Sequence, residues 1–129
     1  MKPVKTVELG KAQRFDESGD RYIEFCKSTV PSDVSFDSLR VVLDCANGAC
    51  YKVSPSILRE LGAEVISIGT EPDGYNINHG CGSTHPERAQ EEVIKQRADF
   101  GIALDGDGDR VVLIDRKGNI LDGDDIMYI

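Results

Sequence analysis

Three aspartates alternate with glycine in the run 103–112, and they are the residues of this chain best suited to chemistry. Asp105, Asp107 and Asp109 stand in an otherwise apolar stretch and are followed directly by Arg110. Three anions so close together repel one another, and a hard divalent cation with oxygen ligands turns that repulsion into binding. Glycine lets the backbone bend so that alternate carboxylates converge. The spacing therefore predicts a magnesium site.

The arginine after the three aspartates indicates a second ligand. Arg110 cannot ligate a metal, but its planar fork of donors matches the oxygens of a phosphate. We therefore interpret the loop as a place where a divalent cation and a phosphoryl group meet.

Two other interpretations of this loop are weaker. An EF-hand calcium loop also opens with alternating acids, but it needs glycine at its sixth position and glutamate at its twelfth. Those positions hold Arg110 and Arg116 here. The other alternative is a solvated Asp-Gly turn between two strands, which the regular spacing of three acids disfavours.

A zinc site is the alternative use of the cysteines and histidines. The chain has four cysteines with irregular spacing and no Cys-x-x-Cys pair, which favours reduced thiols packed as small hydrophobic side chains. A zinc site would have to draw on Cys45, Cys50, His79, Cys81 and His85. We take the structural interpretation for the cysteines.

The composition limits the class of protein. The chain has 129 residues, of which 40% are hydrophobic and 29% charged, enough for one domain with a real core. A net charge of −8 at pH 7 disfavours nucleic acid and anionic membranes as partners, because both attract positive surfaces. No stretch approaches the roughly 20 apolar residues of a spanning helix, and the first residues lack the apolar core of a signal peptide. We expect a cytoplasmic protein.

Hydrophobic periodicity predicts alternating helices and strands. The predicted first helix carries Tyr22, Ile23, Phe25 and Cys26 on one face. In chain order the elements are a helix over 21–29, a strand over 41–43, a helix over 53–61, a strand over 65–68, a long loop over 69–82, a helix from 84 towards 98, and strands over 100–104 and 111–114.

The loop 105–110 decides how the last two strands pair. A parallel pair needs a crossover of about a dozen residues or more, so these strands must be antiparallel neighbours. We therefore predict an α/β fold, a three-layer α/β/α domain with a mixed, mostly parallel four-stranded sheet and an antiparallel last strand. The acidic loop then lies at the carboxyl edge of the sheet, where open α/β sheets bind their ligands.

Single residues outside the acidic loop support weaker hypotheses. Asn47 and Gly48 either shape the active-site edge or only meet the backbone demands of an Asn-Gly turn. His85 is interpreted as structural. Thr84 and Glu87 have the spacing of a capping box at the start of a helix.

Four motifs carry a resemblance to a known family. They are Asp44-Cys-Ala-Asn-Gly-Ala49, Gly80-Cys-Gly-Ser-Thr-His-Pro86, Asp105-Gly-Asp-Gly-Asp-Arg110 and Asp122-Gly-Asp-Asp-Ile-Met127. With them the chain resembles, over nearly its whole length, the second domain of the α-D-phosphohexomutases. Gly108, the last motif and the leading segment 10–26 resemble the bacterial branch that acts on glucosamine phosphates more than the branch that acts on mannose and glucose phosphates.

The resemblance implies an enzyme of four domains that interconverts glucosamine 6-phosphate and glucosamine 1-phosphate for peptidoglycan precursor synthesis. In the family, a phosphoserine of the first domain donates its phosphoryl group, a bisphosphorylated sugar turns over between the domains, and the other phosphate returns to the serine. By position, Asp105, Asp107 and Asp109 would bind Mg²⁺ together with the serine phosphate. Arg110 would be the catalytic, phosphate-binding side chain that helps place the phosphoryl group.

The resemblance also sets expectations for the extent of the chain. Residues 1–129 would form a single domain with a linker helix near the N-terminus and the start of a further helix at 123–129, where Asp122, Asp124 and Asp125 favour the positive helix end. Its partners would be a phosphosugar and the other three domains, whose characteristic loops have no counterpart in this sequence. We expect a fragment that is inactive alone. The alternatives are a phosphomannomutase/phosphoglucomutase domain, or a non-catalytic module that binds a metal or a phosphosugar by itself.

Overall fold

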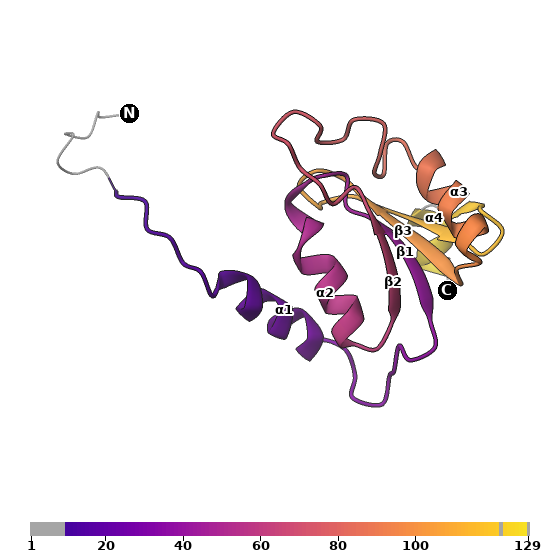
Figure 1. Ribbon diagram of the computed structural model, residues 1–129. Helices are drawn as coiled ribbons and strands as arrows, with labels where there is room; N and C mark the ends of the chain where they lie inside the picture. Colours follow the sequence, from indigo (N-terminus) through magenta and orange to yellow (C-terminus); the bar gives the residue numbers. More distant parts are fainter. Residues whose placement is uncertain (1–9, 122, 129) are drawn as a thin grey trace.

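A mixed sheet of five strands forms the centre of the computed structural model, which describes residues 10–121 and 123–128 (Figure 1). The elements follow in the order α1 (Ser18–Ser28), β1 (Arg40–Asp44), the 3₁₀ helix η2 (Ala49–Tyr51), α2 (Val53–Glu60), β2 (Glu64–Ile68), α3 (Glu87–Gln96), β3 (Phe100–Leu104), β4 (Val111–Asp115), β5 (Ile120–Leu121) and α4 (Gly123–Tyr128). Within these described ranges, no helix combines the length and the apolar character that crossing a membrane requires.

The order of strands in the sheet is β2-β1-β3-β4-β5. β1 runs parallel to both β2 and β3, and β4 runs antiparallel to β3, which confirms the direction predicted from the short loop 105–110. The predicted count of four strands is wrong, because β5 pairs antiparallel with β4 as a fifth strand. β5 has two residues, too few to show the alternation by which a strand is recognised in a sequence.

Helix α3 covers one face of the sheet. Val42 of β1, Ala103 of β3 and Ile114 of β4 form a fully buried cluster with Val93 of α3. Gly101 has no side chain at the point where the helix crosses β3, and a Cβ there would lie 2.6 Å from Val93 Cγ2. The helix therefore packs directly on the strand backbone.

Helix α2 covers the face of the sheet opposite α3. Successive residues of a strand point to opposite sides of a sheet, so the strand residues that alternate with those beneath α3 face α2. Leu43 and Ile102, which alternate with the residues beneath α3, line an apolar cavity together with Ile57 and Leu58 of α2. Helices therefore lie on both sides of the sheet (Figure 1), and the predicted three-layer architecture is confirmed.

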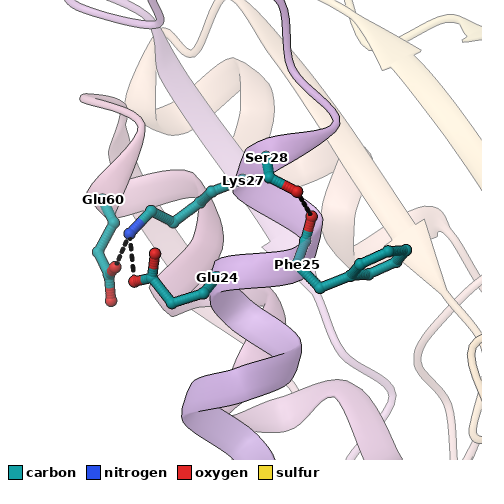
Figure 2. A network of polar contacts seen from close by, with 5 residues as sticks. All are labelled: Glu24, Phe25, Lys27, Ser28 and Glu60. Atoms are coloured by element: carbon teal, nitrogen blue, oxygen red, sulfur yellow. Dashed lines mark hydrogen bonds and ion pairs between the residues drawn. The ribbon is translucent and has the colours of Figure 1, made fainter.

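Helix α1 packs on α2. Lys27 joins the two helices, since its Nζ lies 2.7 Å from Glu24 Oε1 of α1 and 2.7 Å from Glu60 Oε2 of α2 (Figure 2). Tyr22 and Phe25, predicted to share the apolar face of this helix, are exposed. Figure 2 shows the Phe25 ring pointing away from Glu60.

The start of α3 differs from the prediction. The capping-box spacing of Thr84 and Glu87 predicted a helix from residue 84, whereas α3 begins at Glu87 after Pro86 and no side chain caps it. The preceding residues form a turn instead, in which His85 N donates to Gly82 O at 3.0 Å. Gly82 opens this turn with a φ of +76°, a conformation that glycine adopts without strain.

Helix α4 carries acidic residues in its first turn, as predicted. Asp124 and Asp125 follow Gly123 there, where carboxylates favour the positive end of a helix. Asp122, predicted to act with them, and Ile129 lie outside the described residues.

Candidate metal centre

Three loops meet at the carboxyl edge of the sheet. The first loop (45–49) follows β1, the second loop (69–86) follows β2, and the acidic loop (105–110) follows β3. Because β1, β2 and β3 are parallel neighbours, all three loops leave the sheet at the same edge. This is the edge at which open α/β sheets bind ligands.

Backbone hydrogen bonds hold the acidic loop from both sides. Ala49 N of the first loop donates to Gly106 O at 2.8 Å. Ser83 N of the second loop donates to Leu104 O at 2.9 Å, where β3 passes into the acidic loop. The position of the acidic loop therefore depends on both of its neighbours.

The carboxylates of the acidic loop converge. One oxygen each of Asp105, Asp107 and Asp109 lies within 4.8 Å of the other two. The turn is tight, since Gly108 N donates to Asp105 O at 3.1 Å and Gly108 has a φ of +75°. The convergence predicted from the spacing is confirmed. Asp105 is buried, whereas Asp107 and Asp109 are exposed.

Asp105 and Arg110 form an ion pair within the loop. Arg110 N donates to Asp105 Oδ1 at 3.1 Å and Arg110 Nε donates to Asp105 Oδ2 at 2.9 Å. Burial is the largest single influence on the pKa of Asp105 and raises it, but the bonds and the charge of Arg110, with a bond to Asp109, together lower that pKa to about 2. Asp105 is therefore a fixed, ionised carboxylate.

The Arg110 side chain extends from this ion pair into solvent. Its exposed fraction is 62%, and Nε lies 3.6 Å from Asp109 Oδ1. Among the described residues, the terminal Nη nitrogens of Arg110 have no hydrogen-bond partner. Those nitrogens remain available to an anion.

Charge repulsion within the loop is visible at Asp109. The negative charges of Asp107 and Asp105 raise the pKa of Asp109 above its ordinary value. A bound cation would remove that repulsion, and three carboxylate oxygens form a donor set that fits a hard divalent ion such as Mg²⁺. Mg²⁺ usually keeps several waters, which the exposed side of Asp107 and Asp109 can admit.

Asn47 and Gly48 of the first loop, whose roles the sequence left open, contact the two neighbouring loops. A Cβ on Gly48 would overlap the carbonyl oxygen of Gly106 and lie 2.5 Å from its Cα. Asn47, with a φ of +50°, accepts from Glu71 N at 3.1 Å through Oδ1 and donates from Nδ2 to Asn76 O at 3.4 Å. Gly48 thus contacts the acidic loop, and Asn47 contacts the second loop.

Asp44 was not singled out by the sequence analysis as a functional residue. It ends β1, is fully buried, and accepts backbone hydrogen bonds from Ala46 N at 2.9 Å and from Gly82 N at 2.8 Å. The available signal was an acidic residue at the end of an apolar strand, a position where burial of a carboxylate needs a reason.

The structure does not assemble a zinc site from the cysteines and histidines. Among the described residues, Asp105, Asp107 and Asp109 form the one group of three or more potential ligands that come together. All four cysteines are free, and burial raises the pKa of the Cys45 thiol to about 12. His85 is exposed in the turn before α3, outside the helical turn in which it was predicted.

The chain is similar in sequence to known enzymes. Residues 20–118 match the family described as phosphoglucomutase/phosphomannomutase, alpha/beta/alpha domain II. The phosphoglucosamine mutase of Hahella chejuensis is 60% identical over 129 residues, which is 100% of this chain and 29% of that protein. The phosphoglucosamine mutase of Chromohalobacter salexigens is 61% identical over 130 residues, 98% of this chain and 29% of that protein. The chain thus spans 29% of the length of these curated relatives.

Solved structures share the fold. A phosphoglucomutase/phosphomannomutase family protein from Burkholderia thailandensis superposes with a TM-score of 0.67 at 29% identity, covering 84% of this chain and 23% of that one. A candidate phosphomannomutase from Thermus thermophilus superposes with a TM-score of 0.71 at 23% identity, covering 88% of this chain and 27% of that one. In both, the matching part is about a quarter of a larger protein.

Proposed function

Because the chain belongs to the phosphoglucomutase/phosphomannomutase family, as its α/β/α domain II, we propose that it supplies the Mg²⁺-binding loop of a phosphoglucosamine mutase. The observation that carries the proposal is the convergence of three carboxylates within 4.8 Å at the ligand-binding edge of the sheet. The relatives that share 60% and 61% of its residues and carry that name support glucosamine phosphates as the substrates.

The acidic loop has two roles in this proposal. Asp105, Asp107 and Asp109 hold Mg²⁺, which when bound offsets the negative charge that develops on a transferred phosphoryl group. Asp105 is the fixed ligand, because Arg110 and burial restrict its carboxylate. Arg110 directs its unpaired Nη nitrogens at a phosphoryl oxygen and orients that group.

The complete reaction needs parts that this chain does not contain. We propose that glucosamine 6-phosphate and glucosamine 1-phosphate are interconverted through a phosphoserine of another domain and a bisphosphorylated sugar. The phosphoserine oxygen completes the metal site beside the three aspartates. The partners of this domain are accordingly the phosphosugar and the other domains of the enzyme, and the isolated chain has no mutase activity.

Domain exchange tests the proposal. The matching 29% of the Hahella chejuensis phosphoglucosamine mutase is replaced by this chain, and formation of glucosamine 1-phosphate is measured in the presence of Mg²⁺. We expect an active chimera, and loss of turnover on Asp107→Ala with the fold retained by circular dichroism. Asp33→Asn, a change of an exposed carboxylate outside the site, serves as the control.

Each outcome has a distinct meaning. A folded chimera that binds Mg²⁺ but is inactive would contradict the mutase assignment. An active chimera that keeps near-normal turnover after Asp107→Ala would contradict the assignment of the metal ligands. Tight Mg²⁺ binding by the chain alone, unaffected by the other domains, would favour a self-sufficient metal-binding module.

A further inference from the structure

Asp44 is a buried carboxylate whose partners, among the described residues, are all backbone N–H groups. It is 0% exposed, and no arginine or lysine of the described chain forms an ion pair with it. Taking a carboxylate out of water is costly unless hydrogen bonds compensate it. Its two bonds, from Ala46 N at 2.9 Å and from Gly82 N at 2.8 Å, are therefore the reason to ask what it holds.

The two bonds reach different loops. Ala46 belongs to the first loop, two residues beyond Asp44, whereas Gly82 belongs to the second loop, 38 residues away in sequence. One carboxylate thus contacts both the first and the second loop. The second loop is also bonded directly to the first, since Asn78 N donates to Ala46 O at 2.9 Å.

Both loops that Asp44 joins are bonded to the acidic loop or its strand. On one side Ala49 N donates to Gly106 O at 2.8 Å, and on the other Ser83 N donates to Leu104 O at 2.9 Å. The acidic loop therefore lies between two segments that Asp44 joins, together with the bond from Asn78 N to Ala46 O and the bond from Asn47 N to Gly69 O at 2.7 Å.

The packing around these bonds leaves little freedom. A Cβ on Gly69 would lie 2.5 Å from Asp44 Oδ1, and a Cβ on Gly82 would lie 2.5 Å from Leu104 O and 2.6 Å from Ala46 Cβ. Backbones that approach this closely cannot move independently. A shift of the carboxylate therefore displaces the loops around it.

We propose that Asp44 is a positioning residue for the metal site, which sets the place of the acidic loop by holding the first and second loops on either side of it. The inference rests on the proposed function, because it assigns Asp44 to the binding of the ion by Asp105, Asp107 and Asp109. Asp44 itself does not touch the ion.

The substitution Asp44→Asn removes one of the two hydrogen bonds of this side chain and leaves the size of the side chain almost unchanged. The amide oxygen still accepts one backbone N–H, but the amide nitrogen is a donor and cannot accept the other. Either Ala46 N or Gly82 N is then left without its acceptor. Asp115→Asn is the control, because Asp115 also ends a strand and accepts bonds at both oxygens, from Lys117 N and Asn119 N at Oδ1 and from Asn119 Nδ2 at Oδ2. The variant loses the bond at one oxygen there too, but Asp115 pairs with Phe100 at the opposite end of β3.

The test measures Mn²⁺ binding by the whole chain with electron paramagnetic resonance, which reports both the affinity and the symmetry of the bound ion. We expect Asp44→Asn to weaken Mn²⁺ binding by roughly 10-fold, the lower end of what loss of a group bonded directly to a metal ligand costs, because Asp44 acts through the loops. We also expect a change in the line shape of the remaining bound Mn²⁺. Asp115→Asn should lower the melting temperature and leave the affinity and the line shape unchanged.

A second variant tests whether the first loop positions the acidic loop, without disturbing Asp44. Ala49→Pro removes the N–H that bonds to Gly106 O, and proline suits the first position of the helical turn η2 after an extended Gly48. We expect it to weaken Mn²⁺ binding as well, so the proposal stays testable if Asp44→Asn does not fold.

The outcomes separate this inference from the proposed function. If neither the unmodified chain nor the domain-exchange chimera binds Mn²⁺, the metal assignment itself is overturned. If the unmodified chain binds Mn²⁺ and Asp44→Asn binds it equally well, the positioning role alone is overturned. If Asp44→Asn does not fold, unchanged Mn²⁺ binding by Ala49→Pro overturns that role. Equal loss of affinity in Asp44→Asn and Asp115→Asn would show that Asp44 only stabilises the fold.

Discussion

Gly48 and Gly106 lie against each other with no room for a side chain at position 48. A Cβ there would overlap the carbonyl oxygen of Gly106, and the next residue, Ala49, donates its N–H to that same oxygen. The backbone of Gly48, with φ −104° and ψ −163°, is extended and open to any residue. Glycine is therefore needed here for space and not for conformation.

Gly48→Ala should consequently displace the acidic loop. We expect a loss of about 1–3 kcal/mol in the free energy of unfolding, the usual cost of overpacking, and weaker Mn²⁺ binding. Urea unfolding and Mn²⁺ titration measure the two effects. Gly19→Ala is the control, since nothing lies within 4 Å of its Cβ position in α1 and alanine favours a helix. Unchanged metal affinity in Gly48→Ala would contradict the expected displacement.

Asp107→Asn should separate metal binding from folding. Asp107 is exposed, and its charge repels Asp109, so the variant should be at least as stable as the unmodified chain without metal. Its Mg²⁺ affinity should fall by more than the roughly 10-fold to 100-fold that loss of an outer-shell partner costs. Calorimetric titration and thermal unfolding give both quantities. Asp33→Asn should change neither, and an unaltered dissociation constant in Asp107→Asn would remove it from the ligand set.

Metal binding should depend on pH through Asp109. The charges of Asp107 and Asp105 raise the pKa of Asp109, so protons compete with the cation at a higher pH than at an ordinary aspartate, whose pKa is about 3.9. Mn²⁺ affinity should fall as the pH falls through this raised pKa. In Asp107→Asn the decline should begin at a lower pH, because one repelling charge is gone. Identical pH profiles for the two proteins would exclude the repulsion as the cause.

The ion pair of Asp105 and Arg110 should protect the chain against acid. The folded pKa of Asp105 is about 2, below an unfolded value of about 3.9. Ionised Asp105 therefore adds stability that is fully present above about pH 4 and is lost as the pH falls through about 2. Arg110→Ala should reduce this contribution, so the difference in unfolding free energy from the unmodified chain should shrink on acidification through that window.

Urea unfolding at several pH values measures the contribution of Arg110. Arg116→Ala is the matched control, because Arg116 is an exposed arginine on the turn that follows β4. It should give a difference that does not vary across the acid range. A pH-independent effect of Arg110→Ala would mean that the ion pair does not hold the pKa of Asp105 down.

The parts of the fold that were predictable depend on short stretches of sequence. The antiparallel pairing of β3 and β4 followed from the length of 105–110, and the convergence of Asp105, Asp107 and Asp109 followed from alternation with glycine inside one loop. Both are constraints of local geometry. β5 escaped prediction because two residues carry no periodicity, and α3 began three residues late because the turn at Gly82 replaced the predicted cap.

The contacts that hold the loops of the site together could not be predicted from the sequence in the same way. The bond from Gly82 N to Asp44 joins residues 38 positions apart, and the contact of Gly48 with Gly106 joins two loops that follow different strands. Such contacts depend on which strands are neighbours in the sheet. Asn47 illustrates the limit, because the Asn-Gly turn was visible in the sequence while its bonds to Glu71 and Asn76 were not.

The unequal burial of the three carboxylates has a consequence for how fast the ion exchanges. Asp105 is held inside the loop before any ion arrives, while Asp107 and Asp109 stand in water. Mg²⁺ gives up its hydration shell reluctantly. If the site holds Mg²⁺ as proposed, Asp107 and Asp109 would be the ligands that solvent reaches, and Asp105 would be the ligand shielded from it. Exchange of the ion would then proceed from the solvent side and would not require the sheet beneath the loop to move.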